Sequence, residues 1–294
     1  MSANTFVISR QDLRFPAALA AIHDPPDNLW VHGDTNVLRA PAVAIVGSRA
    51  ASPYALEVAR CLGADLARRN IAVVSGMARG VDSAAHKGAL EGGGLTIAVF
   101  GCGVDVIYPP EHQALAAQIA QRGALVSEFP LGMPPLKHHF PQRNRIISGL
   151  SLAVVVVEAA EGSGSLITAD FALEQGRTVL AVPGNVLGGR NCGAHALLRD
   201  GAKLVECADD ILEELPAGLT AEAGGAKESK STRPASHDPV LGSMEEGDSY
   251  DLDEISERSG VDRMRLLPRL LELELAGALR RVEGGRFVRF RGPC

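Results

Sequence analysis

Between residues 43 and 215 the chain alternates short apolar segments with longer amphipathic ones. Seven apolar segments have the length of buried strands, at residues 43–47, 71–76, 96–101, 124–129, 152–159, 178–184 and 202–206. Amphipathic stretches suited to helices lie between most of them, at residues 53–69, 81–91, 111–121 and 166–175. Near-continuous apolar strands that alternate with helices indicate a parallel sheet covered on both faces. We therefore predict a doubly wound, mostly parallel, Rossmann-like α/β domain over residues 43–215.

The segments on either side of this domain differ from it in composition. Residues 1–42 read as an entry segment of the same extended domain, with one extended piece, NLWVHG, at residues 28–33. Residues 216–245 are rich in Ala, Gly, Ser and Pro and have no hydrophobic periodicity. Such a composition predicts a flexible linker.

Residues 246–294 have the outline of a small winged helix. A capped helix is expected to end at Gly260, a second helix at Gly277, and a hairpin with a Gly-Gly turn follows. Pro268 stands inside the second helix and is expected to kink it or delay its start, because proline removes a backbone donor and clashes with the preceding turn.

Charge and cysteine content exclude several classes of protein. The formal net charge is −6, which argues against wholesale coating of nucleic acid but not against a local basic groove. The five cysteines are scattered without a C-x-x-C pair, so we expect reduced thiols and no zinc site. The N-terminus lacks an apolar signal region, and the apolar runs are too short to cross a bilayer. We expect a cytoplasmic protein with no membrane contact.

The segment PPLKHHFPQRNRIISGLS, residues 134–151, is a basic island in this acidic chain. It holds Lys137, His138, Arg143 and Arg145, and no Asp or Glu occurs between Glu128 and Glu158. Asn144 stands between the two arginines, and the residues after them form a helical pattern whose apolar side (Ile146, Ile147, Leu150) should face the core. Phe140 lies among the cations. It either stacks on a base, as aromatic rings do in single-strand binders, or belongs to the core.

Two glycine-bearing turns follow the first two strands. Gly47, Ser48 and Arg49 offer backbone amides, a hydroxyl and a guanidinium to an anion at a helix start. The turn lacks the G-x-G-x-x-G pattern, and no acidic residue ends the second strand, so a nicotinamide dinucleotide is disfavoured. Phosphate or nucleic-acid backbone is a better ligand, and a tight turn with an exposed Arg49 is the alternative.

The second turn carries Arg79, and Asp82 and His86 follow it one helical turn apart. They could form a catalytic dyad, but no nucleophile stands at a spacing that completes a triad. We expect instead that His86 is satisfied by a nearby carboxylate, and we predict no catalytic residue.

A further turn starts a helix with Ser163, Gly164 and Ser165. No Lys follows the glycines, so this is not a Walker P-loop, and ordinary turn chemistry is the alternative. Loops at the carboxyl ends of parallel strands converge on one crevice, so these turns and the basic island are expected to share it. The set offers amides, hydroxyls and cations without a metal cluster or paired carboxylates. It suits the binding of phosphates and requires no cofactor and no metal.

Together these motifs resemble the DNA-processing protein A family (DprA, also called Smf). The resemblance rests on VGSR at residues 46–49, SGMARGVDSAAHKGAL at 75–90, VFGCGVDVIYP at 99–109 and SEFPLG at 127–132. It continues through FPQRNRIISGLS at 140–151, VVVEA at 155–159, SGSLITA at 163–169 and GRTVLAVPG at 176–184. The C-terminal unit is similar to the winged-helix module that some members carry.

The resemblance implies a function and a site. Members bind single-stranded DNA through an extended Rossmann fold, form homodimers and load RecA recombinase in natural transformation; single-strand-binding protein is a further possible partner. The family's DNA pocket corresponds here to Arg49, Lys137, Phe140, Arg143 and Arg145. Many members begin with a small helical domain of the sterile-alpha-motif type, and we expect no such domain in residues 1–294.

Two other hypotheses remain. A phosphoribohydrolase of the lysine-decarboxylase-like group would use P-G-G-x-G-T-x-x-E, but here the Gly-Gly is missing and Glu174 comes too late. Alternatively, the winged helix reads duplex DNA and the protein is a regulator. The hairpin could then supply auxiliary DNA contacts, although the rest of the unit is acidic and a protein contact is equally compatible. These candidate contacts are Arg280, Arg281, Arg286 and Arg289.

Overall fold

The computed structural model describes residues 5–216, 238–245, 248–275, 278–282 and 285–289. The chain divides into two compact units, residues 1–225 and 226–294.

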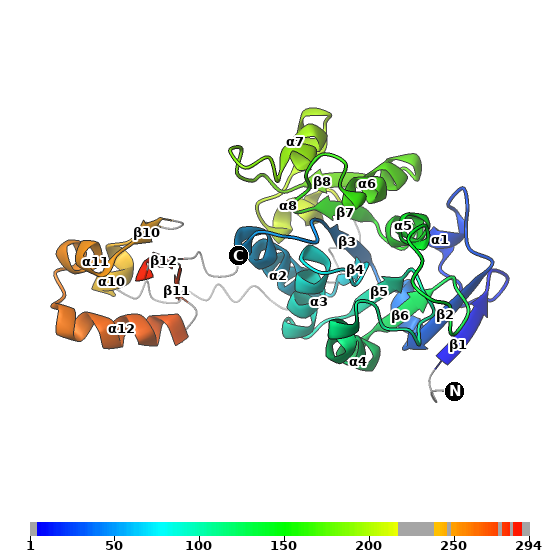
Figure 1. Ribbon diagram of the computed structural model, residues 1–294, viewed down its shortest axis with the longest axis horizontal. Helices are drawn as coiled ribbons and strands as arrows, with labels where there is room; N and C mark the ends of the chain where they lie inside the picture. Colours follow the sequence, from blue (N-terminus) through cyan, green and yellow to red (C-terminus); the bar gives the residue numbers. More distant parts are fainter. Residues whose placement is uncertain (1–4, 217–237, 246–247, 276–277, 283–284, 290–294) are drawn as a thin grey trace. The chain divides into compact units, whose positions relative to one another are not determined.

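The larger unit is built on a nine-stranded sheet in the order β1-β2-β6-β5-β4-β3-β7-β8-β9 (Figure 1). Along this order, all neighbouring strands from β6 through β5, β4, β3, β7 and β8 to β9 pair in parallel. Strand β2 pairs antiparallel with both β1 and β6. The predicted mostly parallel sheet is confirmed, and each of the seven predicted strands is present. The strands are β1 Thr5–Ser9, β2 Asn28–Gly33, β3 Ala42–Val46, β4 Ala72–Ser75, β5 Thr96–Phe100, β6 Ala124–Ser127, β7 Ala153–Val156, β8 Thr178–Ala181 and β9 Lys203–Leu204.

Helices cover both faces of this sheet. One face packs against α1, α5, α6 and α7 through residues such as Leu19, Ile146 and Ala169. The other packs against α2, α3 and α8 through Leu66, Ala85 and Ile211, while Leu115 and Ile119 place α4 over β5 and β6. The helices are α1 Ala17–Ala20, α2 Pro53–Arg68, α3 Val81–Glu91, α4 Gln113–Arg122, α5 His139–Gly149, α6 Gly164–Glu174, α7 Cys192–Arg199 and α8 Ala208–Glu213, with 3₁₀ turns η1 Thr35–Arg39 and η2 Pro110–His112.

The strand order reverses at β3, and this reversal positions the site. From β3 the chain proceeds outward through β4, β5 and β6, whereas β7, on the other side of β3, begins the opposite half of the sheet. The loops that leave the carboxyl ends of β3 and β7 therefore diverge and leave a crevice between them. The Gly47–Arg49 turn follows β3 directly, at this crevice.

The entry segment contains one strand more than the sequence predicted. NLWVHG forms β2 as expected, and β1 pairs with it antiparallel along the outer edge of the sheet. In β1, Ile8 is buried while Phe6 and Val7 are exposed, so its sequence lacks the continuous apolar run that marks a central strand.

The smaller unit has the predicted order of two helices and a hairpin. Its elements are α10 Pro239–Gly242, β10 Ser249–Tyr250, α11 Leu252–Ser259, α12 Arg263–Leu275, β11 Leu279–Arg281 and β12 Phe287–Arg289, with sheet order β10-β12-β11. Asp251 and Glu254 form a capping box at the start of α11, and Gly260 ends it in the left-handed conformation that glycine favours. Helix α12 runs through Pro268 from Arg263, so the proline does not delay its start.

The predicted linker extends too far toward the C-terminus. Val240 and Met244 are buried in the core of the smaller unit together with Ile255 and Leu270. Residues 238–245 are therefore part of that unit, although their composition resembles a linker, because packing and not local composition holds them. The rest of the predicted linker from residue 217, the helix end at Gly277 and the hairpin residue Gly284 lie outside the described residues.

No helix within the described ranges is both long and apolar enough to span a lipid bilayer.

Candidate nucleic-acid interface

The turn after β3 presents Arg49 at the surface. Ser48 N donates a 2.7 Å hydrogen bond to Glu158 O at the end of β7, which ties the two loops of the crevice together. Gly80, at a φ of 77°, packs so closely under this turn that a Cβ there would collide with Ser48 O. Glycine is therefore required at position 80, and the turn that carries Arg79 lies against the turn that carries Arg49.

Arg49 lies beside two aromatic rings. Its Cζ atom is 5.7 Å from the centre of the Phe140 ring, within the range of a cation–π contact. The Tyr108 ring lies 5.5 Å from Phe140, tilted by 41°. Phe140 is half-buried, and a Cβ at Gly101 would press on its ring, so the glycine leaves room for the aromatic side chain.

Lys137 and His138 are exposed immediately before α5. Within the described parts of the chain, neither Arg49 nor Lys137 has a carboxylate in ion-pair range. This surface is called the cation–aromatic cluster below. It consists of Arg49, Tyr108, Lys137, His138 and Phe140.

Arg143 of the basic island lies in the interior. It is 4% exposed, and its Nη1 donates to Gly76 O at 2.8 Å and also to Val99 O. Burial lowers the pKa of the Arg143 guanidinium to about 10, against the opposing effect of the Asp82 carboxylate. The side chain joins the ends of β4 and β5, so its predicted contact with DNA would require it to leave these partners.

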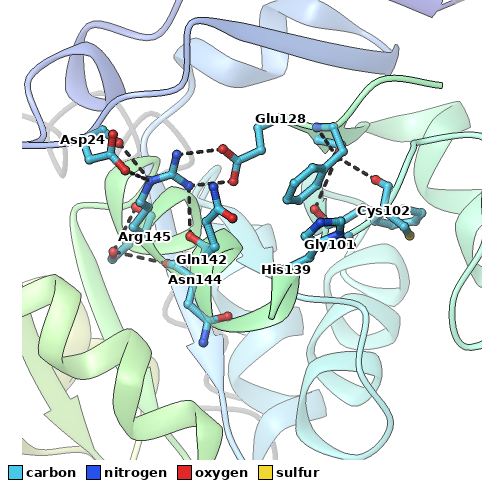
Figure 2. Close-up of polar contacts among 12 residues, drawn as sticks. Asp24, Gly101, Cys102, Glu128, His139, Gln142, Asn144 and Arg145 are labelled. Atoms are coloured by element: carbon cyan, nitrogen blue, oxygen red, sulfur yellow. Dashed lines mark hydrogen bonds and ion pairs between the residues drawn. The ribbon is translucent and has the colours of Figure 1, made fainter. Parts of the chain in front are cut away.

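Arg145 is also turned inward (Figure 2). Its Nη1 and Nη2 each donate a 2.7 Å hydrogen bond to the Glu128 carboxylate, and its Nε donates to Asp24 at 2.9 Å. The side chain of Arg145 is 7% exposed and that of Glu128 is 10%. The absence of acids within the basic island is thus offset by carboxylates from the loop after β6 and from the entry segment.

Asn144 links the basic island to the start of α6. Its Nδ2 donates to Gly164 O at 3.1 Å, so the predicted serine turn lies beside α5. Ser163 caps α6 by accepting from Ser165 N, and the two hydroxyls lie 2.7 Å apart. Gly164 is exposed and Ser165 is buried, so part of the predicted hydroxyl set faces inward.

Arg79 is exposed but paired. Its Nε donates to the Glu111 carboxylate, which also raises the pKa of the guanidinium. Unlike Arg49 and Lys137, it would have to exchange a carboxylate for a phosphate to bind DNA.

The predicted pairing of His86 with a carboxylate is wrong. Asp82 Oδ2 accepts from Gly76 N at 3.1 Å and from Ala78 N at 3.2 Å, so the carboxylate closes its own turn. His86 Nδ1 instead lies 2.7 Å from the Thr96 hydroxyl, and its Nε2 is buried without a hydrogen-bond partner among the described residues. The sequence spacing allows Asp82 and His86 to pair, but in the structure the Asp82 carboxylate accepts from the backbone amides of its own turn instead.

In the smaller unit, two of the four candidate arginines are used internally. Arg286 Nη2 donates to Glu254 at 2.8 Å, and Arg289 Nη1 donates to Leu241 O at 2.6 Å. Arg281 is exposed, and the side chain of Arg280 lies outside the described part.

Sequence reasoning missed Tyr108 and Glu158 as site residues. Glu158 lies two residues beyond the end of β7, at the same sheet edge as Arg49, and this position after a strand was an available signal. Tyr108 gave no signal of its own, since its proximity to Phe140 depends on how two distant loops pack. No cluster of three or more potential metal ligands occurs among the residues that the structure describes.

Comparison with known proteins gives a consistent assignment. The family model for DNA recombination-mediator protein A matches residues 6–216, and that for the DprA winged helix domain matches residues 225–285. Protein Smf of Escherichia coli is 45% identical over 286 residues, which are 95% of this chain and 76% of that protein. DNA processing protein DprA of Streptococcus pneumoniae is 45% identical over 200 residues, 68% of this chain and 71% of that protein.

Solved structures of similar proteins have the same fold. The structure of DprA from S. pneumoniae superposes with a TM-score of 0.70 and 43% identity, covering 73% of this chain and 76% of that one. DNA processing protein A of Helicobacter pylori, described for its single-stranded DNA binding mode, gives a TM-score of 0.65 at 30% identity, covering 72% and 97%. With the predicted motifs, fold and winged helix all matched, the chain belongs to the DNA-processing protein A (DprA/Smf) family.

Proposed function

We propose that the protein binds single-stranded DNA through the cation–aromatic cluster. The observation that carries this proposal is the Arg49 guanidinium over the Phe140 ring, with no carboxylate partner for Arg49 among the described residues. A free cation attracts phosphate, and the face of a half-buried aromatic ring beside it can stack on a base of any sequence. A duplex keeps its bases stacked inside, so this combination favours a single strand.

The predicted DNA contacts divide into three groups. Arg49, Lys137, His138 and Phe140 contact the strand directly, with Gly47 and Ser48 shaping the turn. The second group supports the DNA surface without contacting the strand, by holding α5 against the neighbouring elements; it consists of Arg143, Asn144 and Arg145. Arg79 and the Ser163–Ser165 turn lie at the margin, where Arg79 exchanges Glu111 for phosphate when the strand extends that far.

The test is a salt titration of oligonucleotide binding by Arg49→Ala and Lys137→Ala. Each substitution should weaken single-strand affinity about tenfold for every sequence, and each should reduce the slope of log K against log salt by about 0.7, because one phosphate contact is lost.

The matched control is Arg122→Ala. Arg122 is an exposed arginine at the end of α4, just before β6 starts, at the sheet edge opposite to the cluster. If Arg49→Ala and Lys137→Ala bind as Arg122→Ala does at moderate salt, the site assignment fails.

We further propose that the protein acts in the cytoplasm as a homodimer that protects incoming strands and loads RecA in natural transformation. Its proposed partners also include single-strand-binding protein. Support comes from membership of the family and from the DNA-processing names of its relatives. Sedimentation would test the dimer. RecA loading predicts faster filament formation on strands coated with single-strand-binding protein, and an unchanged rate would contradict it.

The proposal assigns no catalytic step to the protein. Asp82 and His86, the residues that could have formed a dyad, have separate internal partners. Incubation with nucleoside monophosphates should release no free base, and release would favour the phosphoribohydrolase hypothesis instead.

A further inference from the structure

A pocket of about 870 Å³ lies beside the Arg49 turn and takes no part in the cation–aromatic cluster. It is formed by the start of α2, the end of β7 and the loop at residues 183–191 that precedes α7. Its volume is typical of sites that enclose a small molecule or a single nucleotide. The residues that matter for its chemistry are Ser52, Tyr54, Glu158, Leu187, Arg190 and Asn191.

Glu158 supplies hydrogen-bond acceptors to this pocket. The residue is 5% exposed, its Oε2 accepts from Ser52 Oγ at 2.6 Å and its Oε1 from Ser52 N at 3.2 Å. A carboxylate has about four acceptor positions, so capacity remains on both oxygens. No Lys, Arg or His within the described ranges forms an ion pair with it. A buried carboxylate with spare capacity and no cation is suited to N–H donors of a ligand.

Asn191 supplies a donor. The residue is 3% exposed, and its Oδ1 accepts from Ala159 N at 3.4 Å. Its Nδ2 has no hydrogen-bond partner among the residues that the structure describes, and it lies where a Cβ at Gly184 would stand. Glycine at position 184 therefore leaves room for the amide. Because Oδ1 already accepts a hydrogen bond, Nδ2 is the atom of the Asn191 side chain that can donate a hydrogen bond to an acceptor on a ligand.

Apolar groups and one cation surround these two polar residues. Leu187 is 91% exposed on the loop, an unusual position for leucine, and Tyr54 lines the pocket from α2. Arg190 donates through Nη1 to Ala50 O at 3.0 Å, which leaves the other guanidinium nitrogens available at the rim. Ala50 directly follows Arg49, so the pocket adjoins the proposed DNA surface without sharing its residues.

We propose that this pocket binds a guanine base. The N1–H and 2-amino groups of guanine are adjacent donors that match the two oxygens of Glu158. On its other edge, O6 and N7 are acceptors that match Asn191 Nδ2 and Arg190. Leu187 and Tyr54 cover the faces of the ring.

Other bases satisfy fewer of these groups. Adenine and cytosine each direct an unprotonated ring nitrogen, which is an acceptor, at the Glu158 carboxylate. The 6-amino group of adenine would also need an acceptor on its other edge, but Asn191 Oδ1 already accepts from Ala159 N. Thymine and uracil offer a single ring N–H flanked by carbonyl oxygens, which the carboxylate repels. A preference of about tenfold to a hundredfold for guanine follows from one bidentate pair.

The same chemistry has two sources, a free guanine nucleotide or a guanine within the bound strand. The test uses the full chain and calorimetric titration with GMP, AMP, CMP and UMP, alongside oligothymidylates that carry one central guanine or adenine. Tighter binding of GMP identifies a site for free nucleotide. A guanine preference confined to the oligonucleotides identifies a site for a base of the strand. Equal binding of all bases in both series overturns the proposal.

Variants separate this site from its surroundings. Glu158→Gln replaces one acceptor by a donor and should abolish the guanine preference. Leu187→Ala removes an exposed side chain that the fold does not need, and should weaken guanine binding about fivefold by the loss of one apolar contact. Glu161→Gln and Leu173→Ala, both exposed and outside the pocket, are the matched controls.

The outcome is distinguishable from failure of the proposed DNA surface. Arg49→Ala should lose strand affinity and keep its affinity for GMP where the free nucleotide is the ligand. If Glu158→Gln and Leu187→Ala both retain the affinity and base preference of the two control variants, the pocket is not the guanine site.

Discussion

At the scale of single residues, the cations of this chain differ by what surrounds them. Arg49 and Lys137 are exposed without a carboxylate partner among the described residues, and Arg79 is exposed with one. Arg143 and Arg145 are buried with internal acceptors. Of these five cations, only Arg49 and Lys137 have a charge that is free for phosphate, so the cations of the turns and of the basic island have unequal roles.

Phe140 allows the stacking role to be separated from an anchoring role. Phe140→Leu keeps an apolar side chain against Gly101 but removes the aromatic face. Single-strand affinity should fall by about 1–3 kcal/mol, the value of one stacked base, while the melting temperature stays near that of the wild type.

Fluorescence anisotropy and thermal melting of the same preparation provide the two measurements. A variant that loses stability but keeps its DNA affinity would show that the ring only anchors the loop.

His86 predicts an acid-sensitive stability. Burial lowers its pKa to about 3, and His112 and Arg143 act in the same direction. Between about pH 6.5 and pH 3 the unfolded chain binds a proton that the folded chain does not. The free energy of unfolding therefore falls as the pH decreases through this window, by at most about 1.4 kcal/mol per unit for one proton.

Urea unfolding of the wild type and of His86→Gln at pH 7.5, 6 and 5 measures this contribution. The difference between the two proteins should be constant above pH 7 and should shift in favour of the variant below pH 6. A constant difference at all three values would exclude His86 as the source.

At the scale of elements, α5 is the piece that joins the halves of the crevice. It holds β4 and β5 through Arg143, α6 through Asn144, and both β6 and the entry segment through Arg145. Its apolar side, with Ile146 and Ile147, is buried as the sequence predicted. The helix therefore fixes the position of Phe140 at its start relative to the Arg49 turn.

The Arg145–Glu128 pair should be strongly coupled. Arg145→Met leaves the buried Glu128 carboxylate without its cation, and Glu128→Leu leaves Arg145 with the more exposed Asp24 carboxylate. Each single change should cost about 3–5 kcal/mol of unfolding free energy. The double variant should cost clearly less than the sum of the two.

A double-mutant cycle by urea unfolding measures the coupling, with the exposed pair Arg14–Asp12 as the control, whose two substitutions should be nearly additive because solvent screens their charges. Simple additivity of the Arg145 and Glu128 variants would contradict the structural role assigned to this pair.

At the scale of the whole molecule, the two units have separate cores. The three clusters of the larger unit and the single cluster of the smaller one share no residue. Every member of the cation–aromatic cluster belongs to the larger unit. In the smaller unit, Arg286 and Arg289 have internal partners, so a strong duplex contact through the hairpin is not favoured.

A chain ending at residue 237 should therefore keep the melting transition of the larger unit and bind single strands within about twofold of the full chain. A loss of about tenfold or more would instead assign auxiliary DNA contacts to the winged helix, with Arg280 and Arg281 the first residues to substitute. Comparison of single- and double-stranded oligonucleotides in the same assay tests the regulator hypothesis.

The amino-acid sequence by itself determined the alternation of strands and helices, the parallel sheet and the turns at its carboxyl edge. These follow from local periodicity and from glycine and proline positions, which act over a few residues. The placement of Arg49 beside the crevice was predictable for the same reason, since it follows directly from the strand before it.

Only the tertiary structure decided which cations of the basic island are free. Arg145 pairs with Asp24, 121 residues earlier in the chain, and with Glu128, 17 residues earlier. Likewise, Val240 and Met244 are buried in the core of the smaller unit, although the local composition around them predicted a linker. The burial and pairing of these side chains depend on which distant segments pack together. Local sequence patterns act over a few residues and therefore do not show these contacts.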